Sequence, residues 1–272
     1  MDNRSILFLD SGIGGLPYVG AVADLCPDLR PVYIADTANF PYGTRTAAQI
    51  RDVVIDLVDR AVGAFEPGLV VVACNTASVV ALEDLRSRFS VPFVGVVPAV
   101  KPAAAAARTG GIGILSTDRT ADARYLADLV EDFAAGTPVT VRPAGALVSF
   151  VEHRLGAADD AERLEAVRHA LEGLDTAGLD AVVLGCTHFT HLAGEIDRVV
   201  GGETRVVDSR DGVARRVAEL SGDCRAPGAG SQPPGAGAAG SFYVTGSEDD
   251  QAAARYAAVS ARWGLSYEGR FA

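Results

Sequence analysis

The chain has 272 residues, of which 49% are hydrophobic and 22% are charged, and its formal net charge is −11. This composition is typical of a globular protein, and the length suits one large domain or two of roughly 100–150 residues each. The negative charge and the lack of a basic cluster exclude a nucleic-acid-binding surface. No apolar run approaches the ~18 residues that span a bilayer, and the N-terminus lacks a signal peptide pattern. We therefore expect a cytoplasmic protein without membrane association.

Short apolar runs alternate with helical stretches, which predicts an α/β protein with parallel sheets. In the first half we expect strands at residues 6–9, 32–35, 69–73 and 93–97, and helices at 15–25, 47–65, 77–89 and 99–108. The second half repeats the pattern, with strands at 112–115, 139–141, 181–185 and 205–207 and helices at 121–134, 157–174 and 211–220. A strand at 242–245 and a helix at 247–263 follow, and Ser247 with Asp250 resembles a capping box.

The repeated order of strand, polar loop and helix predicts two α/β lobes with a ligand between them. Ligands of open parallel sheets bind beyond the carboxyl ends of the strands, where most polar clusters of this sequence fall. We expect residues 1–98, completed by 210–272, to form the first lobe and 99–209 the second. Residues 225–240 are rich in glycine and proline, which predicts a flexible loop.

A glycine-rich turn, Asp10-Ser11-Gly12-Ile13-Gly14-Gly15, follows the first predicted strand. Such a turn could bind a phosphate through backbone N–H groups, or it could be only a tight turn. The spacing is not that of a dinucleotide-binding motif, and a carboxylate at Asp10 would repel a phosphate. A second loop, Asp36 to Gly43, is either a Pro-Gly turn or a functional loop that adds Tyr42 to the site.

Two of the four cysteines occupy matching places in the two halves. Cys74-Asn75-Thr76 follows a strand of the first half, and Gly185-Cys186-Thr187-His188 follows a strand of the second. A helix N-terminus stabilises a thiolate, so both cysteines are candidate bases. The helix dipole contributes at most ~2 kcal/mol, so other polar groups must stabilise the charge that develops on a substrate. Cys26 and Cys224 are interpreted as structural or surface thiols.

Two other hypotheses use the same residues. Cys186, His188 and His191, with Asp10 or Cys74, could bind zinc. Cys186 and His188 could form a protease-like nucleophilic pair, although residues so close at a strand end need not bring their side chains together. His153 and His169 fall in or near helical stretches and are expected on the surface.

Taken together, these segments resemble glutamate racemase, of the aspartate/glutamate racemase superfamily. The resemblance covers almost the whole chain and includes residues 10–16, 36–37, 41–43, 73–78, 185–188 and 242–246. It implies two pseudo-twofold-related α/β lobes with the active site in the cleft between them, no pyridoxal phosphate and no metal. The presence of a single lysine, Lys101, agrees with the lack of a Schiff-base cofactor. It also implies a small-molecule substrate, glutamate, whose D-enantiomer supplies peptidoglycan synthesis. Members of this family are commonly dimers, so a homodimer is an open expectation.

The resemblance also implies residue roles. Cys74 would remove the α-proton of D-glutamate and Cys186 would return one to the other face, assisted by Asp10 and His188 respectively. The residues implied in binding the substrate's carboxylates and ammonium are Asp10, Ser11, Tyr42, Gly43, Asn75, Thr76, Thr187 and His188, with Thr117, Thr120 and Glu152 from partial matches. Phe189-Thr190, Pro98-Ala99-Val100 and the loop after Cys224 depart from the family's pattern.

Three functions remain in competition at this point. The first is racemisation of glutamate by two bases on opposite faces of Cα. The second is a related reaction with the same cysteines, such as aspartate or hydantoin racemisation, another isomerisation or a decarboxylation. The third is a binding module that keeps the cleft without catalysis, although a receptor needs no thiols.

Overall fold

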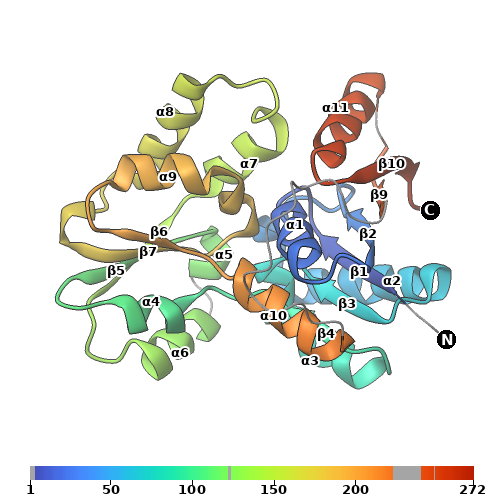
Figure 1. The fold of residues 1–272 in the computed structure, drawn as a ribbon, viewed down its shortest axis with the longest axis horizontal. Helices are drawn as coiled ribbons and strands as arrows, with labels where there is room; N and C mark the ends of the chain where they lie inside the picture. The colour runs from blue at the N-terminus through green and yellow to red at the C-terminus, as the bar shows by residue number, and fades with distance from the viewer. Residues whose placement is uncertain (1–3, 122–123, 223–239, 248) are drawn as a thin grey trace. The chain divides into compact units, whose positions relative to one another are not determined.

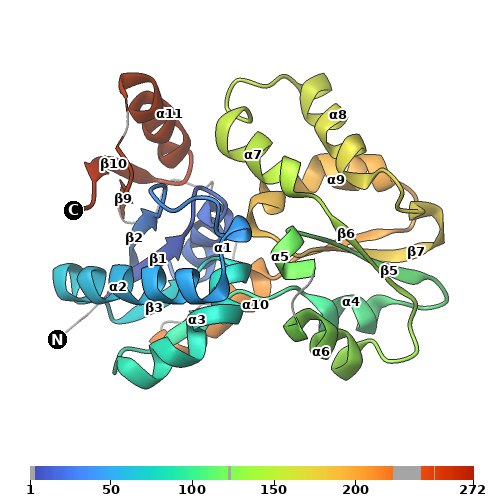
Figure 2. The same ribbon diagram turned by 180° about the vertical axis from the view of Figure 1, so that it is seen from behind.

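The computed structural model describes residues 4–121, 124–222, 240–247 and 249–272. It divides into two compact units, residues 1–96 with 210–272 (unit 1) and residues 97–209 (unit 2). Each unit contains one parallel sheet flanked by helices (Figures 1 and 2). The predicted α/β fold class with parallel sheets is therefore confirmed. Cys224 and most of the predicted 225–240 loop lie outside the described residues.

The sheet of unit 1 has six parallel strands in the order β10-β9-β2-β1-β3-β4. Their bounds are β1 Ser5–Asp10, β2 Arg30–Ala35, β3 Leu69–Val72, β4 Phe93–Gly95, β9 Gly240–Val244 and β10 Leu265–Arg270. The central strands are continuous apolar runs because helices cover both faces of the sheet. Strand β10 was not predicted, and Gly240, assigned to the loop from sequence, begins β9.

Helices cover both faces of this sheet, with α1 (Leu16–Leu25) and α10 (Arg210–Ser221) on one and α2 (Ala47–Phe65) and α3 (Asn75–Arg88) on the other (Figures 1 and 2). Apolar side chains of α2 and α3 pack with those of β1 and β3 into one buried cluster. Helix α2 begins with a capping box, in which Thr46 and Gln49 satisfy each other's backbone N–H groups.

The last helix, α11 (Asp250–Ala261), packs on β10. Its N-cap is Asp249, whose side chain accepts a hydrogen bond from Ala252 N at 2.8 Å. The predicted capping box of Ser247 and Asp250 is therefore wrong, because the helix begins two residues later than the pattern indicated. A carboxylate satisfies the first-turn N–H group as a serine would.

The sheet of unit 2 has four parallel strands in the order β6-β5-β7-β8. Its strands are β5 Gly111–Ser116, β6 Val139–Pro143, β7 Leu179–Leu184 and β8 Arg205–Val207. One face carries α4 (Val100–Ala106) and α6 (Arg124–Phe133), and the other carries α7 (Gly145–His153), α8 (Asp160–Leu171) and α9 (Ala193–Val200) (Figures 1 and 2). A short helix, α5 (Asp118–Ala121), precedes α6, so the single helix predicted at 121–134 is wrong in its beginning.

Helices α7 and α9 were not predicted from the sequence. Helix α7 follows β6 after one residue, Ala144, with none of the polar residues that usually mark a helix start. A 3-10 helix, η3 (Thr187–Leu192), precedes α9. Cys186 therefore precedes a 3-10 helix, at the point where the sequence predicted a helix N-terminus.

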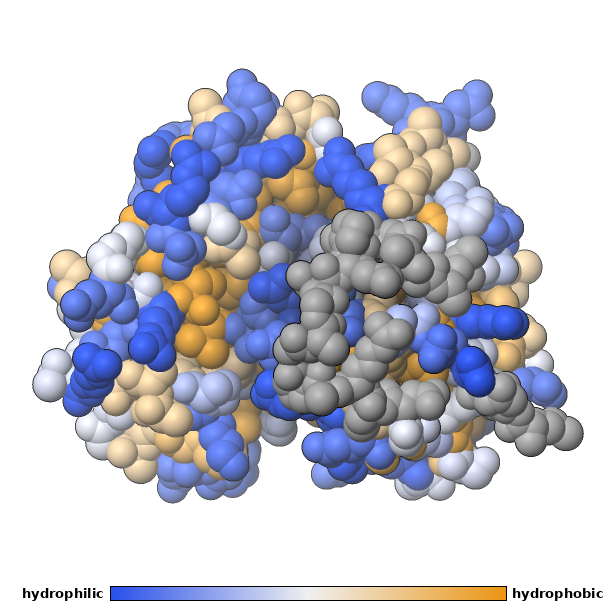
Figure 3. Space-filling view, in the orientation of Figure 1, coloured by the Kyte–Doolittle hydropathy of each residue, from blue (hydrophilic) through white to orange (hydrophobic). Residues whose placement is uncertain are grey.

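The visible surface in Figure 3 is mainly hydrophilic, with hydrophobic residues in separate patches. Among the described residues, Phe133 and Leu220 are the large hydrophobic side chains that are exposed. Within the same residues, every helix is too short or too polar to cross a membrane.

Candidate active site

In unit 1, several polar side chains stand at the carboxyl ends of neighbouring strands. Asp10 ends β1, Asp36 follows β2, Cys74 lies two residues beyond β3 and Thr245 follows β9. All these strands run parallel, so their carboxyl ends share one edge of the sheet. All four side chains are buried. Burial is unusual for the two carboxylates, Asp10 and Asp36, unless they have a role or a partner.

The glycine-rich turn after β1 is closely packed. An added Cβ at Gly15 would lie 2.6 Å from the Cβ of Ala73, the residue before Cys74. The hydroxyl of Tyr33 accepts a hydrogen bond from Gly15 N at 3.0 Å and donates one to the Gly12 carbonyl at 2.8 Å. Asp10 Oδ1 accepts from Ser11 N at 2.6 Å. These contacts explain the turn by the approach of two strand ends and leave no need for a phosphate.

Cys74 occupies the N-cap of α3, with extended backbone angles and a side chain 6% exposed. Helix α3 begins one residue later, at Asn75, so the predicted helix N-terminus beside this thiol is present. Both amide atoms of Asn75 are buried and have no hydrogen-bond partner among the described residues, and Thr76 is also buried. Unpartnered buried polar atoms are costly, so a ligand that bonds to Asn75 would satisfy them.

In unit 2, a chain of three buried side chains contains the second cysteine. Cys186 follows β7, and its sulfur lies 3.9 Å from Nδ1 of His188. Nε2 of His188 lies 3.1 Å from Oε2 of Glu152, which α7 carries. The sequence left open whether Cys186 and His188 bring their side chains together, and they do because the tight turn of η3 folds His188 back.

The Glu152 carboxylate orients the histidine ring. An ionised carboxylate only accepts hydrogen bonds, so an ionised Glu152 would favour the tautomer of His188 with the hydrogen on Nε2. Nδ1 then faces the Cys186 sulfur and can accept the thiol proton, which leaves a thiolate beside an imidazolium. All three side chains are at most 7% exposed, so water screens their interaction little.

The remaining predicted residues of unit 2 lie near this chain of side chains or serve packing. Thr117 and Thr120 follow β5, the neighbour of β7, and their hydroxyls are 3.0 Å apart. Thr187 is buried beside Cys186. In the pair Phe189-Thr190, which departs from the family's pattern, Phe189 is in the core and the Thr190 hydroxyl donates to the Thr187 carbonyl at 2.6 Å.

Glu152 was implied only by a partial match to the family's pattern, and the helix that carries it, α7, was not predicted. The available signal was a carboxylate, Glu152, directly after the largely apolar segment from Leu147 to Val151. Asp36 belongs to the loop after the second predicted strand, and the sequence predicts no role for its side chain. As expected, His153 and His169 are exposed. No set of three or more His, Cys, Asp or Glu side chains in the described part of the chain is arranged to hold a metal ion.

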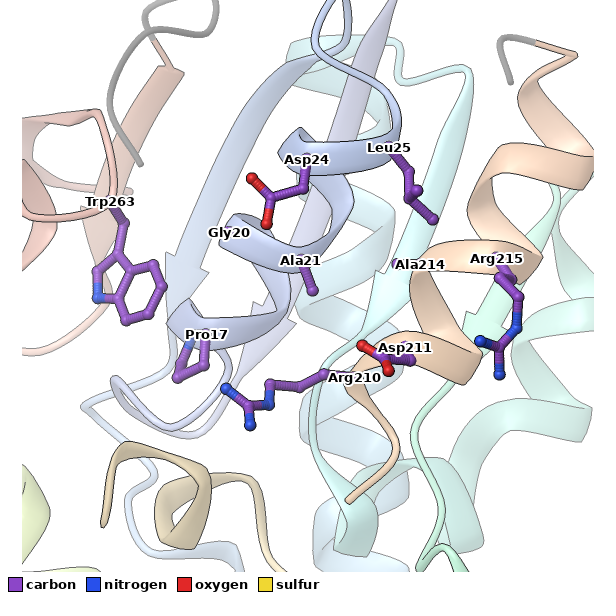
Figure 4. A pocket seen from close by; sticks show the side chains of 10 residues that line it. All are labelled: Pro17, Gly20, Ala21, Asp24, Leu25, Arg210, Asp211, Ala214, Arg215 and Trp263. Atoms are coloured by element: carbon purple, nitrogen blue, oxygen red, sulfur yellow. The ribbon is translucent and has the colours of Figure 1, made fainter. Parts of the chain in front are cut away.

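Two hollows lie away from the cysteines. One, of about 480 Å³, lies between α1 and α10, with Trp263 and Pro17 on one side and Leu25 and Arg215 on the other (Figure 4). The other, of about 430 Å³, lies over α7 and α8 and is lined by Arg142, Phe150 and His153 among others. Neither is lined by Cys74 or Cys186, so we do not assign the chemistry to them.

The chain thus contains two parallel α/β units, each with a buried thiol just beyond the carboxyl end of a strand. Residues 18–217 match the model of the Asp/Glu/Hydantoin racemase family, and the chain belongs to that family. A glutamate racemase of Treponema pallidum is 40% identical over 264 residues, which cover 96% of this chain and 94% of the relative. One of Deinococcus radiodurans is 44% identical over 214 residues, covering 76% and 71%.

Solved structures give the same result. The crystal structure of Escherichia coli glutamate racemase, in complex with L-glutamate and the activator UDP-MurNAc-Ala, matches with a TM-score of 0.86 and 34% identity over 98% of both chains. The resemblance to glutamate racemases that the sequence motifs indicated is confirmed.

Proposed function

We propose that this protein interconverts L- and D-glutamate by moving a proton at Cα between two bases, Cys74 and Cys186, without a cofactor. The observation that carries the proposal is that each unit holds one buried thiol beside polar groups suited to a thiolate. The curated relatives are glutamate racemases, and the Escherichia coli enzyme was solved with L-glutamate.

Inversion at carbon requires that the proton leaves one face and another arrives at the opposite face. Cys74 would remove the α-proton of D-glutamate while Cys186, as a thiol, delivers one, and the roles reverse for L-glutamate. The α3 N-terminus and Asp10 would assist Cys74, and the His188–Glu152 pair would take and return the proton of Cys186. Asn75, Thr76, Ser11 and Thr187 would bind the carboxylates and the ammonium group, together with the loop at Tyr42 and Gly43.

The test is deuterium exchange at Cα in deuterated water, with a panel of both enantiomers of glutamate and aspartate and a hydantoin. Glutamate should acquire deuterium with inversion. Cys74→Ser and Cys186→Ser should each lower racemisation by at least about 10³-fold, because a serine hydroxyl is a far weaker acid than a thiol. Cys26→Ser, a buried cysteine without an assigned role, is the matched control and should retain activity.

The results of this test distinguish the three candidate functions. Exchange confined to aspartate or the hydantoin would favour the related racemases, and binding without any exchange would favour a non-catalytic module. Full activity of Cys74→Ser or Cys186→Ser would refute the assigned roles even if glutamate is the substrate.

The proposed product, D-glutamate, would supply peptidoglycan synthesis, which takes place on precursors in the cytoplasm. A homodimer is part of the same proposal, and light scattering of the purified protein tests it. Deletion of the gene in its host should create a requirement for D-glutamate if no other enzyme supplies it.

A further inference from the structure

Asp36 is a buried carboxylate to which the proposed proton transfer gives no role. It follows β2, is 1% exposed and forms no ion pair with any described residue. Three donors satisfy it instead. The Tyr42 hydroxyl donates to Oδ2 at 2.6 Å and the Thr245 hydroxyl to Oδ1 at 2.5 Å, while the Asn39 amide nitrogen lies 3.1 Å from each oxygen. A buried charge is tolerated only when hydrogen bonds replace its hydration, and here they come from neutral groups.

The donors connect two distant segments of the chain. Asn39 and Tyr42 belong to the loop after β2, whereas Thr245 follows β9, more than 200 residues later in the sequence. Thr245 Oγ1 also accepts from Ala38 N at 3.1 Å, and Thr37 Oγ1 accepts from Gly246 N at 2.8 Å. The loop from residue 37 to 44 is thus fixed against the end of β9, with Asp36 at the centre of the connection.

Two backbone N–H groups of this loop, those of Tyr42 and Gly43, are candidate donors to a ligand. Tyr42 begins a 3-10 turn, Tyr42–Thr44, in which Thr44 N and Arg45 N bond back to Pro41 and Tyr42. In the described part of the chain, the backbone N–H groups of Tyr42 and Gly43 make no hydrogen bond. Adjacent backbone N–H groups at the start of a turn bind anions such as carboxylates.

The Tyr42 side chain cannot itself serve a ligand. Its ring is 1% exposed, and its hydroxyl hydrogen is committed to Asp36. Burial, followed by the charge of Asp36, raises the pKa of Tyr42 well above its ordinary value, so the hydroxyl keeps this hydrogen at all working pH values. The side chain anchors the loop, and only the backbone amides are left to meet a substrate.

We propose that Asp36, together with Asn39 and Thr245, is a positioning residue that holds the Tyr42 side chain and thereby fixes the Tyr42 and Gly43 amides to receive a substrate carboxylate. The inference rests on the proposed function, since it assigns the loop to the same substrate. An ionised carboxylate is required because both of its oxygens accept. In Asp36→Asn, an amide nitrogen must face one of the three donors, which breaks the connection on that side.

The experiment compares Asp36→Asn with the wild type in the full-length protein. We expect KM for glutamate to rise about tenfold or more while kcat falls less than about threefold, because the loop binds a carboxylate and the thiols are untouched. The dissociation constant of glutarate, a dicarboxylate that cannot be racemised, should rise by a similar factor in calorimetry. The pH profile of kcat should not change.

Asp180→Asn is the matched control. Asp180, in unit 2, also fixes a loop, accepting the backbone N–H groups of Arg108, Thr109 and Gly110 at 2.5, 2.9 and 2.8 Å. This variant should lower Tm and leave both KM and the glutarate affinity unchanged. If loosening any such loop raised KM, the special role of Asp36 would be refuted.

A wild-type KM and glutarate affinity in Asp36→Asn would overturn the proposal. If that variant does not fold, Thr245→Val replaces it, because this change removes one donor to Asp36 and keeps the bonds from Tyr42 and Asn39. An unchanged KM in Thr245→Val would also overturn the proposal. A wild-type protein that binds glutarate but does not racemise glutamate would refute the proposed function. The positioning role would then stand or fall on the glutarate affinity of the variant.

Discussion

Three buried side chains in unit 2 set the protonation of one proposed base. Oε2 of Glu152 lies 3.1 Å from Nε2 of His188, and Nδ1 of His188 lies 3.9 Å from the sulfur of Cys186. The histidine therefore has one orientation in which it can hold the thiol proton. Cys74 lies at the start of α3, and Asp10 ends the neighbouring strand β1. The two proposed bases thus differ in how a thiolate is stabilised.

Glu152→Gln tests this asymmetry. We expect racemisation to fall by about 10²-fold, because a neutral amide stabilises the imidazolium less than a carboxylate does. The fall in kcat/KM must be equal in both directions, since the enantiomers have the same free energy. The primary isotope effect should rise with α-deuterated L-glutamate, whose proton Cys186 removes, and fall with α-deuterated D-glutamate.

The matched control is Glu172→Gln, in an exposed pair in which Glu172 lies 3.2 Å from Nδ1 of His169. It should leave the rate and both isotope effects unchanged. Equal changes of the two isotope effects in Glu152→Gln would contradict the pairing of Glu152 with Cys186 alone.

Because of Tyr42, we expect the free energy of unfolding to fall at alkaline pH. Burial and Asp36 raise its pKa well above 10.0 in the folded protein, whereas the unfolded chain keeps the ordinary value. Above that value the unfolded state releases a proton that the folded state retains, so the free energy of unfolding falls as pH rises from about 10. Below pH 10 the contribution is fully present.

Urea unfolding at pH 8 and pH 10.5 measures this loss. Tyr42→Phe should be less stable than the wild type at pH 8, because it loses the bond to Asp36, but it should lose less stability between the two pH values. Tyr243→Phe, in the same unit, should lose as much as the wild type. An identical loss in Tyr42→Phe and the wild type would show that other groups cause it.

At the scale of the elements, strand ends are placed by close backbone approach. Gly185 lies between the end of β7 and Cys186, and an added Cβ there would lie 2.6 Å from the carbonyl oxygen of Leu115 on β5. Gly15 plays the same part in unit 1, where its missing side chain lets the turn after β1 approach Ala73. In both units, a glycine thus lets two strands meet beside a candidate base.

Gly185→Ala should therefore destabilise the protein by roughly 1–3 kcal/mol, because a backbone oxygen cannot move away as a flexible side chain would. Activity should fall as well, since Cys186 is the next residue. Gly194→Ala, in α9 with nothing within 4 Å of the added Cβ, should stabilise by up to about 1 kcal/mol. Urea unfolding measures both, and a neutral Gly185→Ala would refute the steric argument.

At the scale of the whole molecule, unit 2 interrupts unit 1 along the chain. Residues 210–272 return to unit 1 and add α10, β9, α11 and β10 to it. This return brings Thr245 beside Asp36, so the C-terminal segment completes the loop that is proposed to bind a carboxylate. Each unit has its own buried core, which agrees with the repeated pattern of strands and helices in the sequence.

The sequence alone determined the α/β class, most strands and the positions of the two cysteines at strand ends. Apolar runs such as Leu69–Val72 are buried on both faces, and this requirement is visible residue by residue. The sequence also predicted both ends of helix α2 correctly. Its beginning is set locally, because Thr46 and Gln49 form a capping box. The family followed from motifs that are contiguous in the chain.

Only the tertiary structure decided which distant side chains meet. Glu152 lies 36 residues before His188 and Asp36 lies 209 before Thr245, and no local pattern encodes either pair. Helix α7 escaped prediction because it has no polar N-cap, and β10 because its pairing partner β9 lies beyond a helix. A cap or an apolar run depends on neighbours in the chain, whereas a buried carboxylate depends on which donors the fold brings to it.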